Sequence, residues 1–114
     1  AQRAHARGLR ILGTTLTPFA GALPGTPLDD YYAADKDALR QQLNAWLRTD
    51  SPFDAVIDLD AALRDPADPS RMAAAYDSGD HLHPGDAGNR AMAKAVDLDV
   101  LMGPSTHGVD LPRR

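Results

Sequence analysis

The sequence predicts an α/β protein with parallel strands, and three observations support this class. Two short apolar segments, at 9–16 and 55–59, are expected to be strands, and the first does not alternate strictly, which suits a strand covered on both faces. An amphipathic segment at about 30–48 separates them. Strand, helix, strand is the order of a right-handed parallel crossover unit. Typical sheets have about five or six strands, so we expect this 114-residue chain to be the later part of a larger α/β domain. The alternative is a small two-strand fold that a partner or a second copy completes.

The first part of the chain is expected to end a helix and form a strand. Residues 1–7 have the pattern of the last turns of a helix, and Gly8 stands where a left-handed residue would end it. The strand over 9–16 then ends at Pro18. The segment 19–28 contains two glycines and two prolines and is expected to be a loop.

The segment at about 30–48 is expected to be a helix. Aspartates crowd its beginning and Arg48 ends it, which suits the helix dipole. Its large apolar side chains recur at helical spacing, so we expect them to form the face that packs in the core. These residues are Leu39, Leu43, Trp46 and Leu47.

A second strand, 55–59, is expected to lead into a short helical turn. Asp60 can cap this turn, which would run through Leu63. A contact of Asp58 or Asp60 with substrate is the alternative, because both lie at the end of a strand. The segment 65–70, which contains two prolines, is expected to be a loop.

The last third of the chain is expected to hold a polar loop, a helix and a tail. Residues 76–86 are too polar and too rich in turn formers for a regular element. Asp86 is expected to cap a helix that runs to about Val96. Its inward face would consist of small apolar side chains, namely Ala87, Ala91, Met92, Ala95 and Val96. The segment 103–114 is expected to be a tail.

The composition excludes several classes of protein. The chain has 12 basic and 16 acidic residues, a net charge of −4, and its only adjacent basic pair is Arg113-Arg114, which argues against nucleic-acid binding. It has no cysteine, which excludes a disulfide scaffold and a thiolate metal site. No apolar run approaches the length of about 18 residues that a transmembrane helix needs. All 16 acidic residues are aspartates, which we attribute to compositional bias of the source.

Asp80 and His83 are the candidate catalytic residues. A carboxylate three residues before an imidazole can fold back in a turn and accept its Nδ1–H, which leaves Nε2 free to act as a base. Such a pair is two members of a serine-hydrolase triad. In a doubly wound sheet it would lie near the carboxyl ends of the strands, where ligands bind. The alternative is a surface loop in which Asp80 caps a turn and His83 packs.

Two other chemical roles are open to the same loop. His81 and His83 could share a metal ion with Asp77 or Asp80, although His81 can equally be a filler between the two candidate residues. Of the serines, Ser78 is nearest to His83. Its place five residues earlier in the same loop is a poor position for attack geometry, so we expect no nucleophile within this chain.

The string D-S-G-D-H-L-H-P-G-D-A-G at 77–88, ahead of an alanine-rich helix, resembles the last motif block of SGNH (GDSL-type) hydrolases. Segments 8–19 and 53–66 are similar to the strands and loops that precede it, so the resemblance covers about residues 3–101. It implies a flavodoxin-like three-layer α/β/α fold, with two strands and about three helices in this chain. It also implies catalytic roles for Asp80 and His83.

The resemblance further implies a serine esterase or lipase that needs no cofactor and is secreted by bacteria. A small-molecule ester would be the substrate, either a carbohydrate acetyl ester or a lipid ester. The family's nucleophile belongs to a Gly-Asp-Ser block, and this sequence contains no such tripeptide. Nothing in it matches the blocks that hold the oxyanion-hole Gly and Asn.

We therefore expect residues 1–102 to be the C-terminal portion of one domain. Its N-terminal half, possibly a separate chain, would carry the nucleophile and the oxyanion hole. This chain alone is expected to be inactive. The alternative is a non-catalytic α/β module that a partner chain completes.

Overall fold

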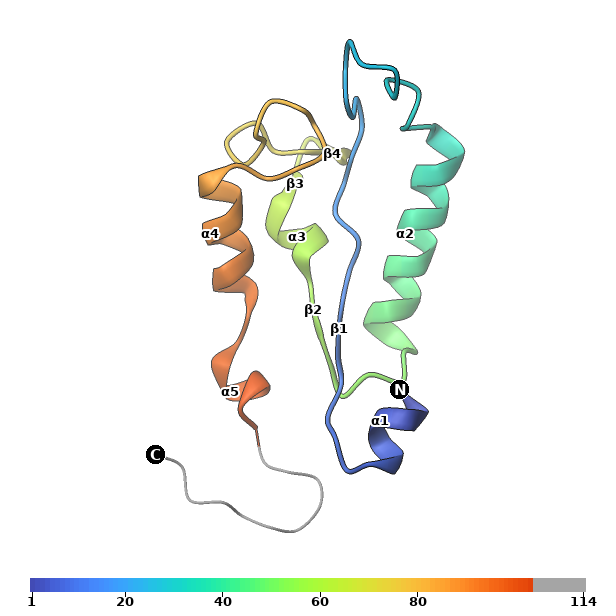
Figure 1. Cartoon of the computed structure of the whole chain (residues 1–114), viewed down its shortest axis with the longest axis vertical. Coiled ribbons are helices and arrows are strands. Elements are labelled where there is room, and N and C mark those ends of the chain that lie inside the picture. Colours follow the sequence, from blue (N-terminus) through green and yellow to red (C-terminus); the bar gives the residue numbers. More distant parts are fainter. Residues whose placement is uncertain (104–114) are drawn as a thin grey trace.

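The computed structural model describes residues 1–103, and the expected tail, apart from Gly103, lies outside them. Two strands pair in parallel, β1 (Leu12–Thr14) and β2 (Ala55–Ile57), with Gly13 opposite Val56. The helix α2 (Ala34–Thr49) connects them. This arrangement confirms the predicted α/β class. Figure 1 shows α2 and α4 (Asp86–Ala95) on opposite sides of the two strands.

The helix α1 (Gln2–Ala6) precedes β1 and ends as predicted. Gly8 follows it in the left-handed region, with φ of 73°. The strand β1 is shorter than the expected 9–16, because its partner β2 offers three residues for pairing. The side chain of Phe53 lies directly over Gly13, and an added Cβ there would stand 2.7 Å from its Cε2 atom. Glycine at this position lets the aromatic ring lie against the strand.

The helix α2 begins at Ala34, four residues later than expected. The preceding residues form turns, in which the N–H of Tyr31 donates to the carbonyl of Leu28 at 3.0 Å. The ring of Phe19 packs edge-on against Tyr31 and Tyr32, with centroid distances of 5.6 and 5.1 Å. These aromatic contacts hold the segment before the helix in a turn.

The prediction for the inward face of α2 was wrong. Leu39 is 65% exposed, and Leu43 and Trp46 are also exposed, so only Leu47 of the predicted set is buried. The face that packs inward instead carries Asp37, Arg40, Asn44 and Leu47. The spacing of apolar residues identifies one face of a helix, but it does not show whether that face packs against the rest of this chain.

The inward side chains of α2 are stabilised by polar contacts with one another and with residues that follow the two strands. Arg40 donates from Nη1 to Asp60 at 2.7 Å and from Nε to Asp37 at 2.9 Å. Asn44 bonds both the N–H and the carbonyl of Leu16, at 2.8 and 2.9 Å. Among the described residues, every buried side-chain polar atom has a partner. The complete pairing offsets the cost of burying these groups.

The short helix α3 (Leu59–Leu63) is capped by Asp58, not by Asp60 as predicted. The Asp58 Oδ1 atom accepts a hydrogen bond from the N–H of Ala61 at 3.0 Å. Asp60 is buried and receives guanidinium groups from three arginines, namely Arg40, Arg48 and Arg64. Asp60 therefore joins α2 to α3.

The expected loop at 65–70 is in fact part of a hairpin, so the chain has more strands than the predicted two. It consists of β3 (Arg64–Asp65) and β4 (Asp68–Met72), which pair antiparallel. Pro66 lies in its turn and Pro69 in a strand. A two-stranded hairpin consists of edge strands, in which proline is tolerated.

The helix α4 has Gly85 at its N-cap position, so Asp86 is its first helical residue and not the predicted cap. The Asp86 carboxylate still lies in the first turn, where the helix dipole favours it. The expected inward side chains of α4 are half-buried. A further helix, α5 (Leu98–Leu101), was not predicted and is capped by Asp97.

Within residues 1–103, no helix has both the length and the apolar character needed to cross a membrane.

Candidate functional site

Asp80 and His83 contact each other directly in the loop before α4. The Nδ1 atom of His83 lies 2.6 Å from Asp80 Oδ2. The other carboxylate oxygen accepts the backbone N–H groups of Leu82 and His83, at 2.9 and 2.8 Å. The imidazole is 68% exposed, so its Nε2 side is open to a reaction partner.

The charge state of Asp80 determines which side chain donates the hydrogen bond in this contact. The hydrogen bond to the His83 side chain, with those from the backbone N–H groups, holds the pKa of Asp80 well below its usual range. An ionised carboxylate accepts hydrogen bonds and donates none. His83 must therefore carry its hydrogen on Nδ1, and Nε2 of the neutral ring is then the basic nitrogen.

The loop is closed by backbone pairing at its base. Asp77 and Pro84 form an isolated antiparallel bridge, and the N–H of Ser78 donates to the carbonyl of His83 at 3.1 Å. Gly88, in the first turns of α4, packs against the same base: an added Cβ would stand 2.6 Å from Pro84 Cβ and would collide with Tyr76. Close packing thus explains why the D-A-G sequence of the motif has a glycine.

A second loop holds the site from the side of β1. The N–H of Leu23 donates to the carbonyl of Asp80 at 2.7 Å. Both loops lie at the end of the molecule where the parallel strands terminate (Figure 1), which is where the sequence placed the site. Leu23 and His81 have positive φ values of 59° and 58°, and no other non-glycine residue does so within 1–103. Such strain gathers at functional sites.

The described serine hydroxyls all donate to acceptors other than the His83 ring. Ser78 donates to Asp80 at 3.1 Å, Ser70 to Asp68 at 2.6 Å, and Ser51 to the carbonyl of Leu47 at 2.8 Å. Ser105 lies outside the described residues. The Ser78 hydroxyl therefore supports the carboxylate of the pair instead of facing the imidazole.

The two imidazoles of the loop pair separately with two carboxylates. His81 contacts Asp77 through Nδ1, while His83 contacts Asp80. In the part of the chain that the structure describes, no three acidic or imidazole side chains are placed to hold a metal ion. The sequence predicted Asp77 and His81 only as possible metal ligands, not as a second carboxylate–imidazole pair. Their i, i+4 spacing was the available signal.

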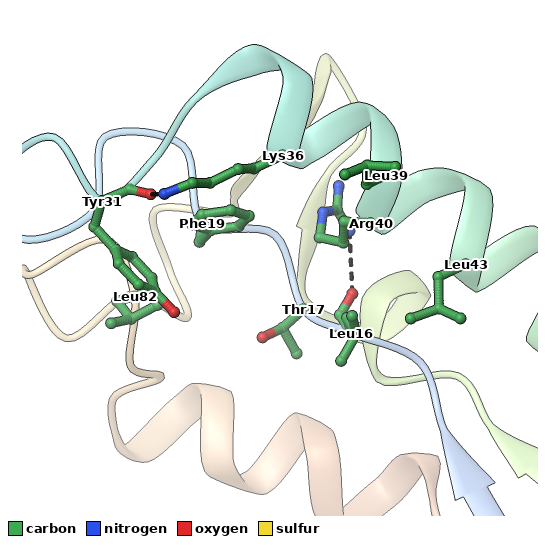
Figure 2. A pocket seen from close by; sticks show the side chains of 9 residues that line it. All are labelled: Leu16, Thr17, Phe19, Tyr31, Lys36, Leu39, Arg40, Leu43 and Leu82. Carbon is green, nitrogen blue, oxygen red and sulfur yellow. Dashed lines mark hydrogen bonds between the residues drawn. The ribbon is translucent and has the colours of Figure 1, made fainter.

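A cavity of about 360 Å³ lies beside the loop. Figure 2 shows its walls, which come from the segment after β1, from α2 and from Leu82. Lys36 donates to the carbonyl of Tyr31 at 2.9 Å across one end, and Arg40 donates to that of Leu16 at 3.1 Å. The remaining lining is mostly apolar: Phe19, Leu39, Leu43 and Leu82.

Comparison with known proteins identifies the family. The family model described as GDSL-like lipase/acylhydrolase matches residues 1–96. No curated protein matches the chain. The family match covers most of the 114 residues and confirms the resemblance noted in the sequence. The chain belongs to the GDSL-like lipase/acylhydrolase family, whose activity is that of lipase- and esterase-type hydrolases.

Proposed function

We propose that this chain supplies the acid and the base of a serine esterase. A serine hydroxyl attacks the ester carbonyl while Nε2 of His83 takes its proton. The protonated imidazole then returns the proton to the leaving alcohol, and an acyl-enzyme forms. Water then attacks the acyl group as His83 takes its proton, and the imidazolium returns that proton to the departing serine oxygen, which releases the carboxylic acid. Asp80 orients the ring and stabilises the imidazolium in both steps.

The contact between Asp80 and His83 carries this proposal. It combines a short carboxylate–imidazole distance of 2.6 Å with a histidine side chain that is 68% exposed. A histidine that merely packs in a surface loop would have no need of an ionised carboxylate on Nδ1. The two backbone N–H groups on Asp80 keep that carboxylate in place.

We place the nucleophile and the oxyanion hole outside this chain. The sequence has no Gly-Asp-Ser block, and the described serine hydroxyls donate to other acceptors. On this proposal the chain alone is inactive, because a triad without its nucleophile loses most of the rate enhancement. The substrate would be a carboxylic ester of a carbohydrate or a lipid, and secretion stays a prediction.

We also propose that the N-terminal half of the domain covers one side of α2 and one edge of the sheet. The apolar stripe of α2 is exposed at Leu39, Leu43 and Trp46. The sheet has two strands within 1–103, so each strand has one edge without a neighbouring strand. A further strand and helix would cover both features. Leu39 and Leu43 also line the cavity of Figure 2, so this half would close its open side.

Reaction of the native protein with a fluorophosphonate serine probe tests the proposal, with intact mass measured after denaturation. We expect an adduct on a longer species or on a companion chain. Changing His83→Ala should abolish it, because the serine then lacks its base. His5→Ala is the matched control, since it removes a histidine that pairs with Asp54 at 2.8 Å far from the loop.

The other outcomes contradict specific parts of the proposal. An adduct on the 12.2 kDa chain itself would place the nucleophile within it and return attention to Ser78. Labelling that persists in His83→Ala would refute the role of His83. If nothing reacts even in a sample that contains the N-terminal half, the serine-esterase assignment is wrong, and a non-catalytic module is the better description.

A further inference from the structure

The loop that holds Asp80 and His83 contains a second carboxylate–imidazole pair. The side chain of Asp77 is only 7% exposed. One of its oxygens accepts the N–H groups of Gly79 and His81, at 2.8 and 3.0 Å, and the other contacts His81 Nδ1. Asp77 therefore holds His81 by both its backbone and its ring.

The charge on Asp77 determines which member of the pair donates the hydrogen bond. Partial burial raises the pKa of Asp77, but the hydrogen bonds from Gly79 and His81 outweigh it, so the pKa lies below the ordinary value. The carboxylate is thus ionised at neutral pH and can only accept. His81, like His83, must present Nδ1–H to its partner.

The backbone of His81 has an unusual conformation at a decisive point. Its φ of 58° lies in the left-handed region, which is unfavourable for a residue with a Cβ. His81 stands between Asp80 and Leu82, so this turn sets the direction of the chain that follows. The N–H groups of Leu82 and His83 then both reach the same oxygen of Asp80. The conformation of His81 and the contacts of Asp80 are therefore linked.

We propose that Asp77 and His81 are positioning residues that keep the Asp80 carboxylate and the His83 ring in contact. This inference rests on the proposed function, because it concerns how the base of that reaction is oriented. The bonds from Asp77 keep His81 in the left-handed turn, and the turn brings the N–H groups to Asp80. Without them the loop samples other turns, and His83 no longer meets a fixed carboxylate.

Substitutions at His81 separate this role from simple loss of a side chain. His81→Ala removes the ring bond and disfavours the left-handed turn. His81→Asn keeps both requirements, since asparagine tolerates this conformation and its amide can donate to Asp77. Asp77→Asn retains an oxygen for the backbone N–H groups but turns an amide toward the ring of His81. The matched control is His5→Ala, which removes an imidazole–carboxylate contact elsewhere.

The experiment is ¹⁵N NMR of the histidine rings in the full chain at a pH where they are neutral. The ratio of the Nδ1–H to the Nε2–H tautomer of His83 is the quantity measured. We expect the Nδ1–H form to dominate in the wild type. The ratio should fall about tenfold in His81→Ala, the factor that corresponds to one charge-assisted hydrogen bond. It should recover in His81→Asn and stay unchanged in His5→Ala.

The outcomes distinguish this inference from the proposed function. A wild-type His83 in the Nε2–H form would contradict the proposed function itself. A wild-type Nδ1–H form that survives in His81→Ala would overturn the positioning role alone. The amide resonance of Gly13, in the sheet, reports whether each variant is folded. If His81→Ala loses it, Asp77→Asn decides: an unchanged ratio there overturns the inference, and a fallen ratio supports it.

Discussion

The backbone N–H of Leu23 donates to the carbonyl of Asp80 at 2.7 Å, and this bond joins two strained loops. Leu23 itself has φ of 59°, and His81, the residue after Asp80, has φ of 58°. The loop after β1 therefore holds Asp80 in place through a hydrogen bond from a separate segment of the chain. Leu23 donates the hydrogen bond that joins the loops, and His81 directly follows its acceptor, so both strained residues lie at the site.

The left-handed backbone of Leu23 predicts that a polar substitution is tolerated better than an apolar, β-branched one. Leu23→Val should lower the free energy of unfolding by about 1–2 kcal/mol, because a β-branched residue resists the left-handed conformation. Leu23→Asn should be better tolerated than Leu23→Val, although asparagine is the more polar change at this half-buried position. Urea unfolding of the two variants checks the order. A more stable Leu23→Val would show that the conformation is not retained in solution.

The buried arginine of α2 is predicted to be essential for stability. Arg40→Leu leaves the carboxylates of Asp37 and Asp60 without their shared guanidinium. Both are about 6% exposed, and breaking a buried ion pair in this way costs about 3–5 kcal/mol. The control is Arg71→Leu, whose pair with Asp68 is exposed and 3.8 Å long, and whose cost should be below about 1 kcal/mol. Equal losses in denaturant unfolding would contradict the burial argument.

Gly88→Ala is predicted to disturb the candidate site from within α4. The added methyl group meets Pro84 and the backbone of Tyr76, neither of which can move without opening the loop. We expect a loss of about 1–3 kcal/mol, the usual cost of overpacking, although alanine is the better helix former. Asn89→Ala, at the adjacent exposed position, should be neutral or slightly stabilising. Thermal unfolding followed by circular dichroism compares the two, and a Gly88→Ala variant as stable as the wild type would refute the close packing.

The ion pair between Asp58 and Arg48 predicts a pH-dependent part of the stability. The side-chain hydrogen bond from Arg48 lowers the pKa of Asp58 from 3.8 to about 2. The stabilisation is therefore complete above about pH 4 and is lost as the pH falls through 2. Because Asp58 is about one-third exposed, we expect a contribution of only about 1 kcal/mol.

The variant Asp58→Asn measures this contribution directly. Its deficit in unfolding free energy should be largest at neutral pH and should shrink as the pH is lowered from 4 toward 2. Asp30→Asn, at an exposed position before α2, serves as the control with little effect at any pH. A deficit for Asp58→Asn that is constant with pH would contradict the assigned ion pair.

The elements with strong local signals could be predicted from the sequence. Gly8 ends α1, and the apolar segments around Ile11 and Val56 form parallel strands. The spacing of Asp80 and His83 allowed a folded-back contact, which the structure contains. These features depend on residues close together in the chain, or on a period that one type of element satisfies.

Other features depended on partners that a local pattern does not reveal. The caps of α3 and α4 lie one or two residues earlier than predicted, because Asp60 pairs with the buried Arg40 and Gly85 lies at the base of the loop. The hairpin of β3 and β4 was hidden by prolines, which usually mark loops. The Asp77–His81 pair was visible only as a metal-ligand pattern until its geometry was known.

The sequence by itself determined the α/β class, the family and the identity of the candidate acid and base, because these follow from residue order and from a short motif. Only the tertiary structure decided which face of α2 packs inward. Leucines and a tryptophan mark one face, but the strand ends offer Asn44 and Arg40 their partners and leave Leu39 and Trp46 exposed. The inward face is buried because its polar groups are all paired, and the partners of Asn44 and Arg40 are Leu16 and Asp60, which lie 20 or more residues away in the chain.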